Sequence, residues 1–217
     1  MPTPVRARFF IARHGETVFN AVRRMQGEAE HTPLTRAGFA QADEIGAALA
    51  GALGAKPALA LWASPTGRAL QTLAVAAEHL ELDWHGARTD ARLGEMEMGA
   101  WGGRFYADID AETGGFVDRQ AGLFTQCPPG GEWYDAIAVR LRAWLDDFAH
   151  EGGDRLIVMH GISSRVLRGV LTGAPDRPGC GAPVAAPLPQ GSVVCIEDGV
   201  ETVIGRGSGD LGASGTA

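Results

Sequence analysis

The stretch Phe9-Phe10-Ile11-Ala12-Arg13-His14-Gly15-Glu16-Thr17 contains the signal around which the chain is arranged. A short apolar run closed by a glycine is typical of a buried strand, so we predict a strand from about Val5 to Arg13. His14 then lies just beyond its carboxyl end, the edge where open α/β sheets bind ligands. An arginine beside a histidine is costly to bury there unless an anion binds to the pair. We therefore expect a phosphate ester at this edge, attacked by His14.

A second junction of the same kind occurs far along the chain. The apolar run from Leu156 to Met159 ends in His160-Gly161. A single Arg-His-Gly tripeptide is also consistent with a surface turn after a strand. Two strand-like runs that each end in His-Gly instead predict two imidazoles that meet at one sheet edge.

Helix and strand signals alternate in the rest of the chain. We predict four helices. The first follows the N-cap Thr35 and ends near 51–54, and the second starts at the N-cap Ser64 with Pro65 in the first helical position. The other two cover 133–148 and 166–171. The predicted strands are 58–63, 156–159, and a hairpin of 192–197 with 200–204 around Asp198-Gly199. This order favours an α/β protein.

Arg68 falls in the first turn of the helix predicted after Ser64. A cation at this end opposes the helix dipole, which prefers anions. An anion held jointly by Arg68 and the helix N-terminus would remove the conflict. The alternative is an exposed arginine without a role.

Composition argues against several kinds of partner and cofactor. The net charge of −7 makes nucleic acid and anionic membranes poor partners. Cys127, Cys180 and Cys195 form no CxxC pair, which favours a reduced cytosolic protein and argues against a zinc site. No signal peptide and no apolar segment of about 20 residues is visible. We expect a cytoplasmic protein without a metal or other cofactor.

We predict a single domain over residues 1–206. Residues 104–130 are rich in glycine and mixed in pattern, which is typical of a partly helical, lid-like insertion. Residues 207–217 are small and polar, so we predict a disordered tail. Arg165 and Arg168 are expected to be solvated.

Five motifs, in order, resemble the histidine phosphatase superfamily, also called the phosphoglycerate-mutase-like family. They are RHGET at 13–17 with Asn20, PLT at 33–35 followed by Gly38 and Gln41-Ala42, SPTGRALQT at 64–72, LGEMEMGAW at 93–101, and MHG at 159–161. The resemblance runs from roughly residue 8 to residue 197. It implies a three-layer α/β/α sandwich with a mostly parallel central sheet.

The resemblance also implies roles for single residues. His14 would be the nucleophile that becomes phosphorylated, and Glu95 would give a proton to the leaving group. The rest of the phosphate-binding core would be Arg13, Arg68 and His160. Asn20 and the backbone N–H of Gly161 would contact the phosphoryl oxygens. Apart from the resemblance, we expect Gln26 to contact the substrate in an outer pocket, and no metal is required.

The chemistry of phosphoryl transfer agrees with these roles. Charge spreads over the equatorial oxygens of the phosphoryl group, and arginine provides permanently charged, bidentate donors for them. His14 must be neutral to attack, and neighbouring positive charges lower its pKa. A hydrogen bond from its other nitrogen to a backbone carbonyl would fix the tautomer. His160, if protonated, would stabilise the charge of the transition state.

These motifs favour a phosphomonoesterase that acts on a small phosphorylated metabolite. The loop after Glu95, with Gly99 and Trp101, resembles the phosphatase branch. The runner-up is a cofactor-dependent phosphoglycerate mutase, and a non-catalytic module that binds a phosphorylated ligand is the second alternative. A homodimer is compatible with the sequence.

Two positions depart from the pattern of the phosphatases. Gly102 stands where they often have glutamate, and His31 stands where they often have aspartate. Both departures affect the choice of substrate more than the chemistry. Candidates for the outer pocket, which are equally consistent with ordinary surface residues, are Arg23, Arg24, Arg104, Tyr106 and Arg119.

Overall fold

The fold is built on a six-stranded sheet. The structure is a computed structural model that describes residues 7–211. The strands, in spatial order, are β10 (Val200–Gly205), β9 (Val193–Glu197), β1 (Phe9–Arg13), β6 (Asp154–Met159), β2 (Leu59–Ala63) and β3 (Arg88–Thr89). From β1 to β3 all pairings are parallel, while β9 and β10 form an antiparallel hairpin at one edge. The predicted, mostly parallel sheet is confirmed.

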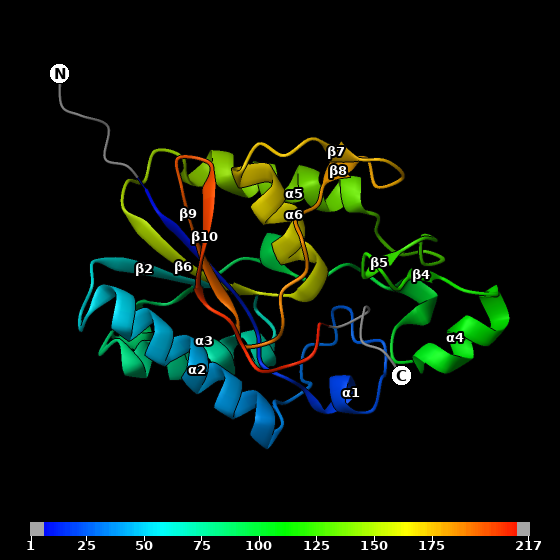
Figure 1. Cartoon of the computed structure of the whole chain (residues 1–217), viewed down its shortest axis with the longest axis horizontal. Helices are drawn as coiled ribbons and strands as arrows, with labels where there is room; N and C mark the ends of the chain where they lie inside the picture. The colour runs from blue at the N-terminus through cyan, green and yellow to red at the C-terminus, as the bar shows by residue number, and fades with distance from the viewer. Residues whose placement is uncertain (1–6, 212–217) are drawn as a thin grey trace.

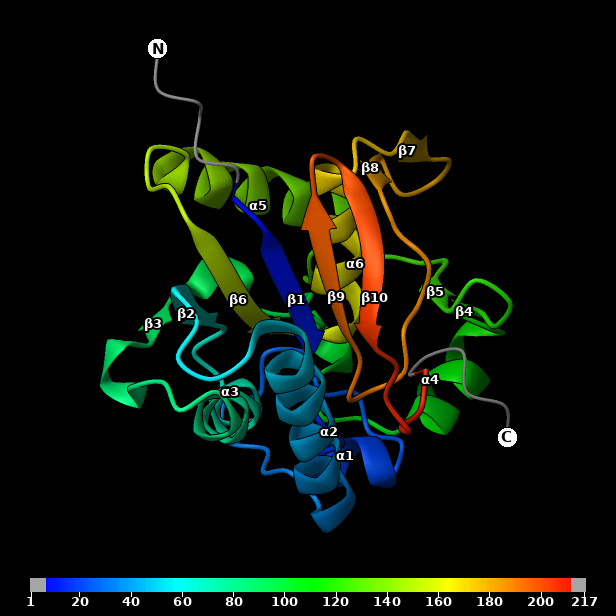
Figure 2. The same cartoon turned by 60° about the vertical axis from the view of Figure 1, so that its left-hand side comes forward.

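Helices cover both faces of this sheet (Figures 1 and 2). One face carries α2 (Arg36–Leu53) and α3 (Gly67–His79), and the other carries α5 (Tyr134–Phe148) and α6 (Gly161–Leu171). Because successive side chains of a strand point to opposite faces, Phe10 and Ala12 join the core on the α2 and α3 side while Ile11 joins the core on the other. The three-layer α/β/α arrangement is therefore confirmed.

The ends of the helices agree only in part with the prediction. Thr35 is the N-cap of α2, where its hydroxyl accepts a hydrogen bond from the Gly38 N–H at 3.0 Å. The prediction for α3 was wrong by two residues, since Thr66 rather than Ser64 is the N-cap. The backbone N–H of Ser64 still donates to Val158 of β6 at 3.1 Å, so the extended chain continues past Ala63.

The insertion at 104–130 has short elements of its own. It contains α4 (Tyr106–Thr113) and a small antiparallel pair of β4 (Val117–Asp118) and β5 (Leu123–Phe124). Figures 1 and 2 show these elements set apart from the sheet. The remaining short elements are α1 (Val18–Ala21), β7 (Asp176–Arg177), β8 (Ala182–Pro183), and 3₁₀ turns at Trp84–Gly86, Ala91–Leu93 and Gly99–Trp101.

The segment after β10 differs from the disordered tail that we predicted. Residues 207–211 are held by backbone hydrogen bonds, which include Gln190 N–H to Asp210 O at 3.0 Å and Gly209 N–H to Gln190 O at 3.1 Å. The small glycines that suggested disorder are what allows close contact, because a Cβ at Gly207 would lie 2.1 Å from the Gln190 oxygen. Residues 212–217 lie outside the described part of the chain.

Within residues 7–211, none of the helices combines the length and the apolar character that crossing a bilayer would require.

Candidate active site

The two histidines meet because their strands are neighbours. Strands β1 and β6 pair in parallel with Arg13 opposite Met159, so His14 and His160 follow at the same level. The His14 N–H donates to Met159 O at 2.9 Å, and the ring centroids of His14 and His160 are 5.1 Å apart at 67°. The structure thus brings together the two imidazoles that the His-Gly junctions suggested.

His14 has one defined tautomer. Its Nδ1 lies 2.7 Å from the carbonyl oxygen of Gly15. A carbonyl only accepts hydrogen bonds, so Nδ1 carries the proton and Nε2 keeps its lone pair. Burial, followed by the charges of Arg68 and Arg13, holds the pKa of His14 well below its ordinary value of 6.5. The ring is therefore neutral, with a nucleophilic nitrogen at Nε2.

His160 has the opposite tautomer. Its Nδ1 accepts a hydrogen bond from Arg68 Nε at 3.2 Å, so the proton is on Nε2. Burial, followed by the Arg68 charge, lowers the pKa of His160 well below 6.5. The protonated His160 that we considered from the sequence is thus disfavoured, because a charged ring would be desolvated beside the positive charge of Arg68. Within residues 7–211, no group accepts a hydrogen bond from the buried Nε2.

Arg68 donates a hydrogen bond to His160 and does not line the cavity. Its guanidinium is completely buried and donates to Gly27 O at 2.7 Å and to Ala29 O at 2.6 Å. Burial lowers its pKa to about 10, which still leaves it charged at neutral pH. The site of joint anion binding expected from its position in α3 is occupied instead by a loop of this chain and the His160 ring.

Arg13 lies beside His14 and lines the cavity. Its Nη1 donates to Asp210 O at 3.1 Å and, more weakly, to Leu188 O at 3.4 Å. Its Nε is buried and has no acceptor among the described residues. Burial lowers the pKa of Arg13, while the negative charges of Glu95 and Asp210 oppose that shift. Arg13 Nε and His160 Nε2 are therefore two buried N–H groups without acceptors among the described residues, one on the residue next to His14 and the other on the ring that packs against it.

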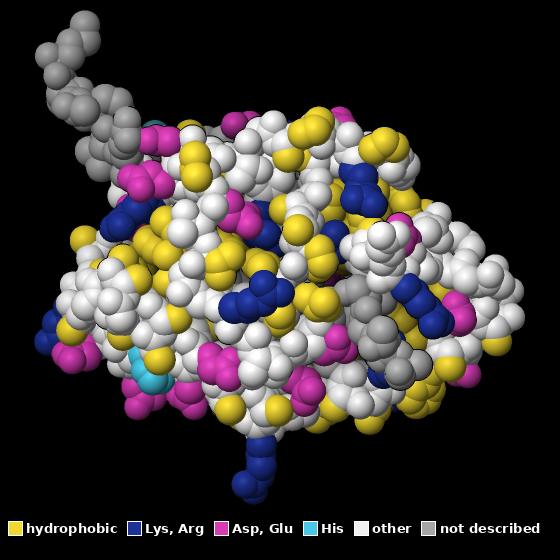
Figure 3. Space-filling model, in the orientation of Figure 1, with side chains coloured by type: hydrophobic (Ala, Val, Ile, Leu, Met, Phe, Trp, Pro, Cys, Tyr) yellow, Lys and Arg dark blue, Asp and Glu magenta, His cyan; other side chains and the backbone are white. Residues whose placement is uncertain are grey.

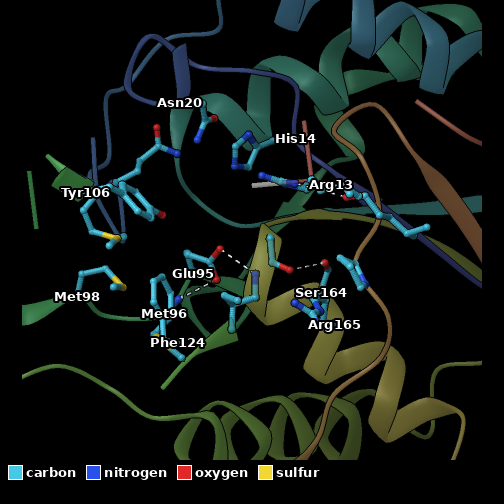
Figure 4. Close-up of a pocket in the computed structure, with 18 of the residues that line it drawn as sticks. Arg13, His14, Asn20, Glu95, Met96, Met98, Tyr106, Phe124, Ser164 and Arg165 are labelled. Carbon is cyan, nitrogen blue, oxygen red and sulfur yellow. Dashed lines mark hydrogen bonds between the residues drawn. The ribbon is translucent and has the colours of Figure 1, made fainter. Parts of the chain in front are cut away.

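The side chain of Glu95 is held by backbone N–H groups in the first turn of α6, the helix that begins directly after His160. Its Oε2 accepts from Ile162 N–H at 3.0 Å, and its Oε1 accepts from Ser163 N–H at 3.0 Å and Met96 N–H at 2.9 Å. These bonds satisfy N–H groups that a helix start leaves unpaired. Figure 4 shows the carboxylate on the cavity wall, on the same side of the cavity as Met96.

Asn20, Gln26 and Gly161 also line the cavity. The side-chain oxygen of Asn20 accepts from Thr17 N–H at 3.1 Å and from Gln190 Nε2 at 2.9 Å, which fixes the amide beside His14. The side-chain oxygen of Gln26 accepts from the Thr17 hydroxyl at 2.5 Å. Of the predicted site residues, Arg68 and His160 are fully buried and do not line the cavity, but the His160 ring packs against the His14 ring, which does.

Several cavity residues were missed or misjudged in the sequence. Arg165 and Arg168 are buried and line the cavity, although we expected them to be solvated. Both are stabilised by oxygens from distant segments, a contact that no local pattern predicts. Other lining residues that were missed include the apolar Met96, Met98, Phe124, Leu188 and Leu211. Of the outer-pocket candidates, Arg24 and Tyr106 line the cavity and Arg23 lines a smaller neighbouring one, whereas Arg104 and Arg119 pair with Glu112 and Asp110.

A family comparison agrees with this geometry. The family described as the histidine phosphatase superfamily (branch 1) matches residues 9–196. The chain belongs to this superfamily.

Relatives of this chain include proteins named as mutases and proteins named as phosphatases. A protein of Enterobacter sp. (strain 638) named "Probable phosphoglycerate mutase GpmB" is 34% identical over 169 residues, which are 76% of this chain and 75% of that protein. The mycobacterial glucosyl-3-phosphoglycerate phosphatase, solved in complex with VO3, has a TM-score of 0.71 and 25% identity over 94% of this chain and 100% of its own. Bacillus stearothermophilus YhfR has a TM-score of 0.69 and 26% identity, over 96% of this chain and 100% of its own.

The two departures from the usual phosphatase pattern lie outside the cavity. Gly102 follows a 3₁₀ turn and donates its N–H to Gly99 O at 3.1 Å. The His31 side chain is 90% exposed and lies beside Glu30. In the part of the chain that the structure describes, no cluster of three or more His, Cys, Asp or Glu residues could hold a metal ion.

Proposed function

We propose that this histidine phosphatase is a metal-independent phosphomonoesterase that acts on a small phosphorylated metabolite through a phosphohistidine on His14. The observation that carries the proposal is the set of three unsatisfied nitrogens at the site. His14 Nε2 has a free lone pair, whereas Arg13 Nε and His160 Nε2 are buried donors without acceptors. Unpaired buried donors destabilise a fold. Phosphoryl oxygens would satisfy both donors while the phosphorus faces His14.

The first step forms a bond from His14 Nε2 to phosphorus and breaks the ester P–O bond. The leaving alkoxide takes a proton from the Glu95 carboxyl, whose place on the cavity wall is fixed by three backbone N–H groups. Arg13 and the neutral His160 N–H stabilise the charge on the phosphoryl oxygens.

The second step breaks the P–N bond. Water attacks the phosphohistidine, Glu95 takes up a proton from that water, and inorganic phosphate leaves. Glu95 and His14 thus return to their starting states. The arginines supply the positive charge, so we expect turnover to persist in EDTA.

A phosphoglycerate mutase is the second candidate, because the curated relatives at 33–34% identity carry that name. The two activities differ in the fate of the phosphohistidine. A mutase returns the phosphoryl group to a bound sugar acid, whereas a phosphatase passes it to water. Mixing the protein with 3-phosphoglycerate and a trace of 2,3-bisphosphoglycerate separates them: formation of 2-phosphoglycerate faster than phosphate release would favour the mutase.

The direct test is to trap the intermediate. Acid-labile phosphate should appear on His14 by mass spectrometry after rapid mixing with p-nitrophenyl phosphate. His14→Ala should remove this signal and lower kcat by a factor of about 1,000 or more, with an unchanged circular dichroism spectrum. A wild-type protein that binds phosphate but forms no phosphohistidine would instead be a module that binds phosphorylated ligands.

A further inference from the structure

The side-chain amide of Asn20 has only one orientation that suits a phosphate site. Its NH₂ end can donate to phosphoryl oxygens, whereas its carbonyl end would repel them. Figure 4 shows this amide beside the His14 ring, with the nitrogen on the cavity side. On the face of the molecule drawn in Figure 3, Lys and Arg side chains are scattered among Asp and Glu. The binding of a phosphate ester therefore depends on how the donors inside the cavity are oriented.

Two donors hold the carbonyl end of Asn20 away from the cavity. Its Oδ1 accepts from the Thr17 N–H at 3.1 Å and from Gln190 Nε2 at 2.9 Å. A backbone N–H can only donate, so Thr17 fixes which end of the Asn20 amide is the oxygen. The bond from Gln190 then uses the second lone pair of that oxygen. Among residues 7–211, no group accepts from the Asn20 nitrogen, so its N–H groups remain for a ligand.

Gln190 donates to Asn20 while its own carbonyl oxygen stays unpaired. The side chain is completely buried, and its Oε1 has no donor in the described part of the chain. Turning the amide of Gln190 over would place Oε1 against the Asn20 oxygen, so the orientation of one amide dictates that of the other. A buried acceptor without a donor is destabilising. Stability alone therefore does not account for a glutamine at this position.

The backbone of Gln190 is anchored by the segment 207–211. Its N–H donates to Asp210 O at 3.0 Å, and its carbonyl oxygen accepts from the Gly209 N–H at 3.1 Å. The next residue, Gly191, has a φ of 83°, a left-handed conformation that glycine adopts without strain. The side chain of Gln190 therefore starts from a fixed backbone beside Asn20.

We propose that Gln190 is a positioning residue for phosphoryl transfer, which turns the NH₂ end of Asn20 toward the phosphoryl oxygens. Both residues line the small cavity next to the main one, but only Asn20 of the two lines the main cavity. Gln190 thus acts through Asn20 and does not contact the substrate. This inference rests on the proposed phosphomonoesterase function.

Gln190→Met tests the proposal, because it removes the donor to Asn20 and the unpaired acceptor at similar volume. We expect kcat/KM for p-nitrophenyl phosphate to fall by about tenfold, the value of one hydrogen bond to a charged group. The Ki of vanadate, which mimics the phosphoryl group in transfer, should rise by a similar factor. The melting temperature should not fall, because the unpaired acceptor is lost together with the bond. A lower melting temperature with an unchanged Ki would show a purely structural role and overturn the proposal.

A double-mutant cycle with Asn20→Ala shows whether the effect passes through Asn20. When no amide is left to orient, adding Gln190→Met should change kcat/KM by less than about twofold. Gln71→Met is the matched control, since the Gln71 side-chain oxygen also accepts from a backbone N–H, that of Leu34 at 3.1 Å, but outside both cavities. It should leave kcat/KM and Ki unchanged. Losses that multiply in the double variant would overturn the proposal.

NMR of the wild-type protein tests the same point without a variant. On titration with vanadate, the side-chain NH₂ signals of Asn20 should shift together with the ring nitrogens of His14. Shifts of His14 without any change at the Asn20 amide would overturn the proposal, even if Gln190→Met failed to fold. Failure of the proposed function has a different signature, which is the absence of phosphohistidine with any ester.

Discussion

The two site histidines are set to opposite tautomers by opposite neighbours. The Gly15 carbonyl can only accept, so it draws the proton of His14 to Nδ1. The Arg68 guanidinium can only donate, so it leaves the proton of His160 on Nε2. The result is a lone pair on one ring and a donor on the other, without a charge on either. A phosphoryl group needs both, one for attack and one for its oxygens.

Arg68→Met tests this arrangement. The substitution removes the donor to His160 Nδ1, so we expect His160 to exchange tautomers and kcat to fall by about 100-fold, as for the loss of one preorganised donor. ¹⁵N NMR of the imidazole nitrogens and kcat on p-nitrophenyl phosphate are the measurements. An unchanged kcat with a mixed His160 tautomer would show that the orientation of this ring is irrelevant to turnover.

Substrates with different leaving groups test whether Glu95 gives a proton, separately from its contact with α6. Glu95→Gln keeps one of the two oxygens that accept from backbone N–H groups but has no acidic proton to give. We expect a loss of about 100-fold or more for alkyl phosphates, whose alkoxide needs protonation, and a much smaller loss for p-nitrophenyl phosphate. Equal losses in kcat for both esters would remove Glu95 from the acid role.

At the scale of elements, α6 is the main support of the site. It starts directly after His160, its first turn holds Glu95, and one of its faces lines the cavity. A helix could be predicted here from the spacing of its apolar residues, although we placed it at 166–171 and it starts at Gly161. The burial of Arg165 and Arg168 could not, because their partners are Ala121, Gly122, Ala185 and Glu201, far along the chain. Local polarity alone suggested solvent.

Residues 207–211 are the second element that matters for the site, since Asp210 O accepts from Arg13. Gly207→Val should detach this segment, because even a Cβ would lie 2.1 Å from Gln190 O. We expect KM for phosphate esters to rise by about fivefold, the value of one hydrogen bond, and limited proteolysis near residue 206 to become faster.

Gly86→Ala is the control for this change, since no atom lies within 4 Å of a Cβ built there. It should leave both the KM and the proteolysis rate at their wild-type values. Wild-type behaviour of Gly207→Val as well would show that the segment has no part in holding Arg13.

At the scale of the whole molecule, the two buried histidines tie folding stability to pH. Their pKa values in the folded state lie well below 6.5, chiefly because of burial. As the pH falls through about 6.5, the unfolded chain binds a proton on each histidine and the folded chain does not. The free energy of unfolding is therefore highest above that pH and decreases below it. Each histidine contributes a slope of up to about 1.4 kcal/mol per pH unit.

Urea unfolding between pH 7.5 and 5.5 measures this slope. We expect the free energy of unfolding to decrease toward pH 5.5. In His160→Asn this decrease should be smaller, because one of the two histidines that take up a proton on unfolding is gone. His31→Asn, at an exposed position, should not change it. A His160→Asn slope equal to that of the wild type would mean that folded His160 takes up its proton as readily as the unfolded chain does.

Most of the architecture could be predicted, because it depends on signals within a few residues. The apolar runs of β1 and β6, the N-cap Thr35 and the Asp198-Gly199 hairpin are of this kind, and each is present in the structure. The start of α3 was misplaced because Ser64 remains bonded to β6, a contact between distant segments. The ordered segment 207–211 was missed for the same reason, since its glycines fit against Gln190 and Gly191.

The contact between Asp210 and Arg13 has a practical consequence for the enzymologist. A purification tag added after Leu211 would extend the chain from a residue that lines the cavity. A tag at the amino end would instead precede Phe9, at the end of β1 opposite to Arg13. Kinetic constants from a carboxyl-terminal fusion should therefore be compared with those of the cleaved protein before substrates are ranked.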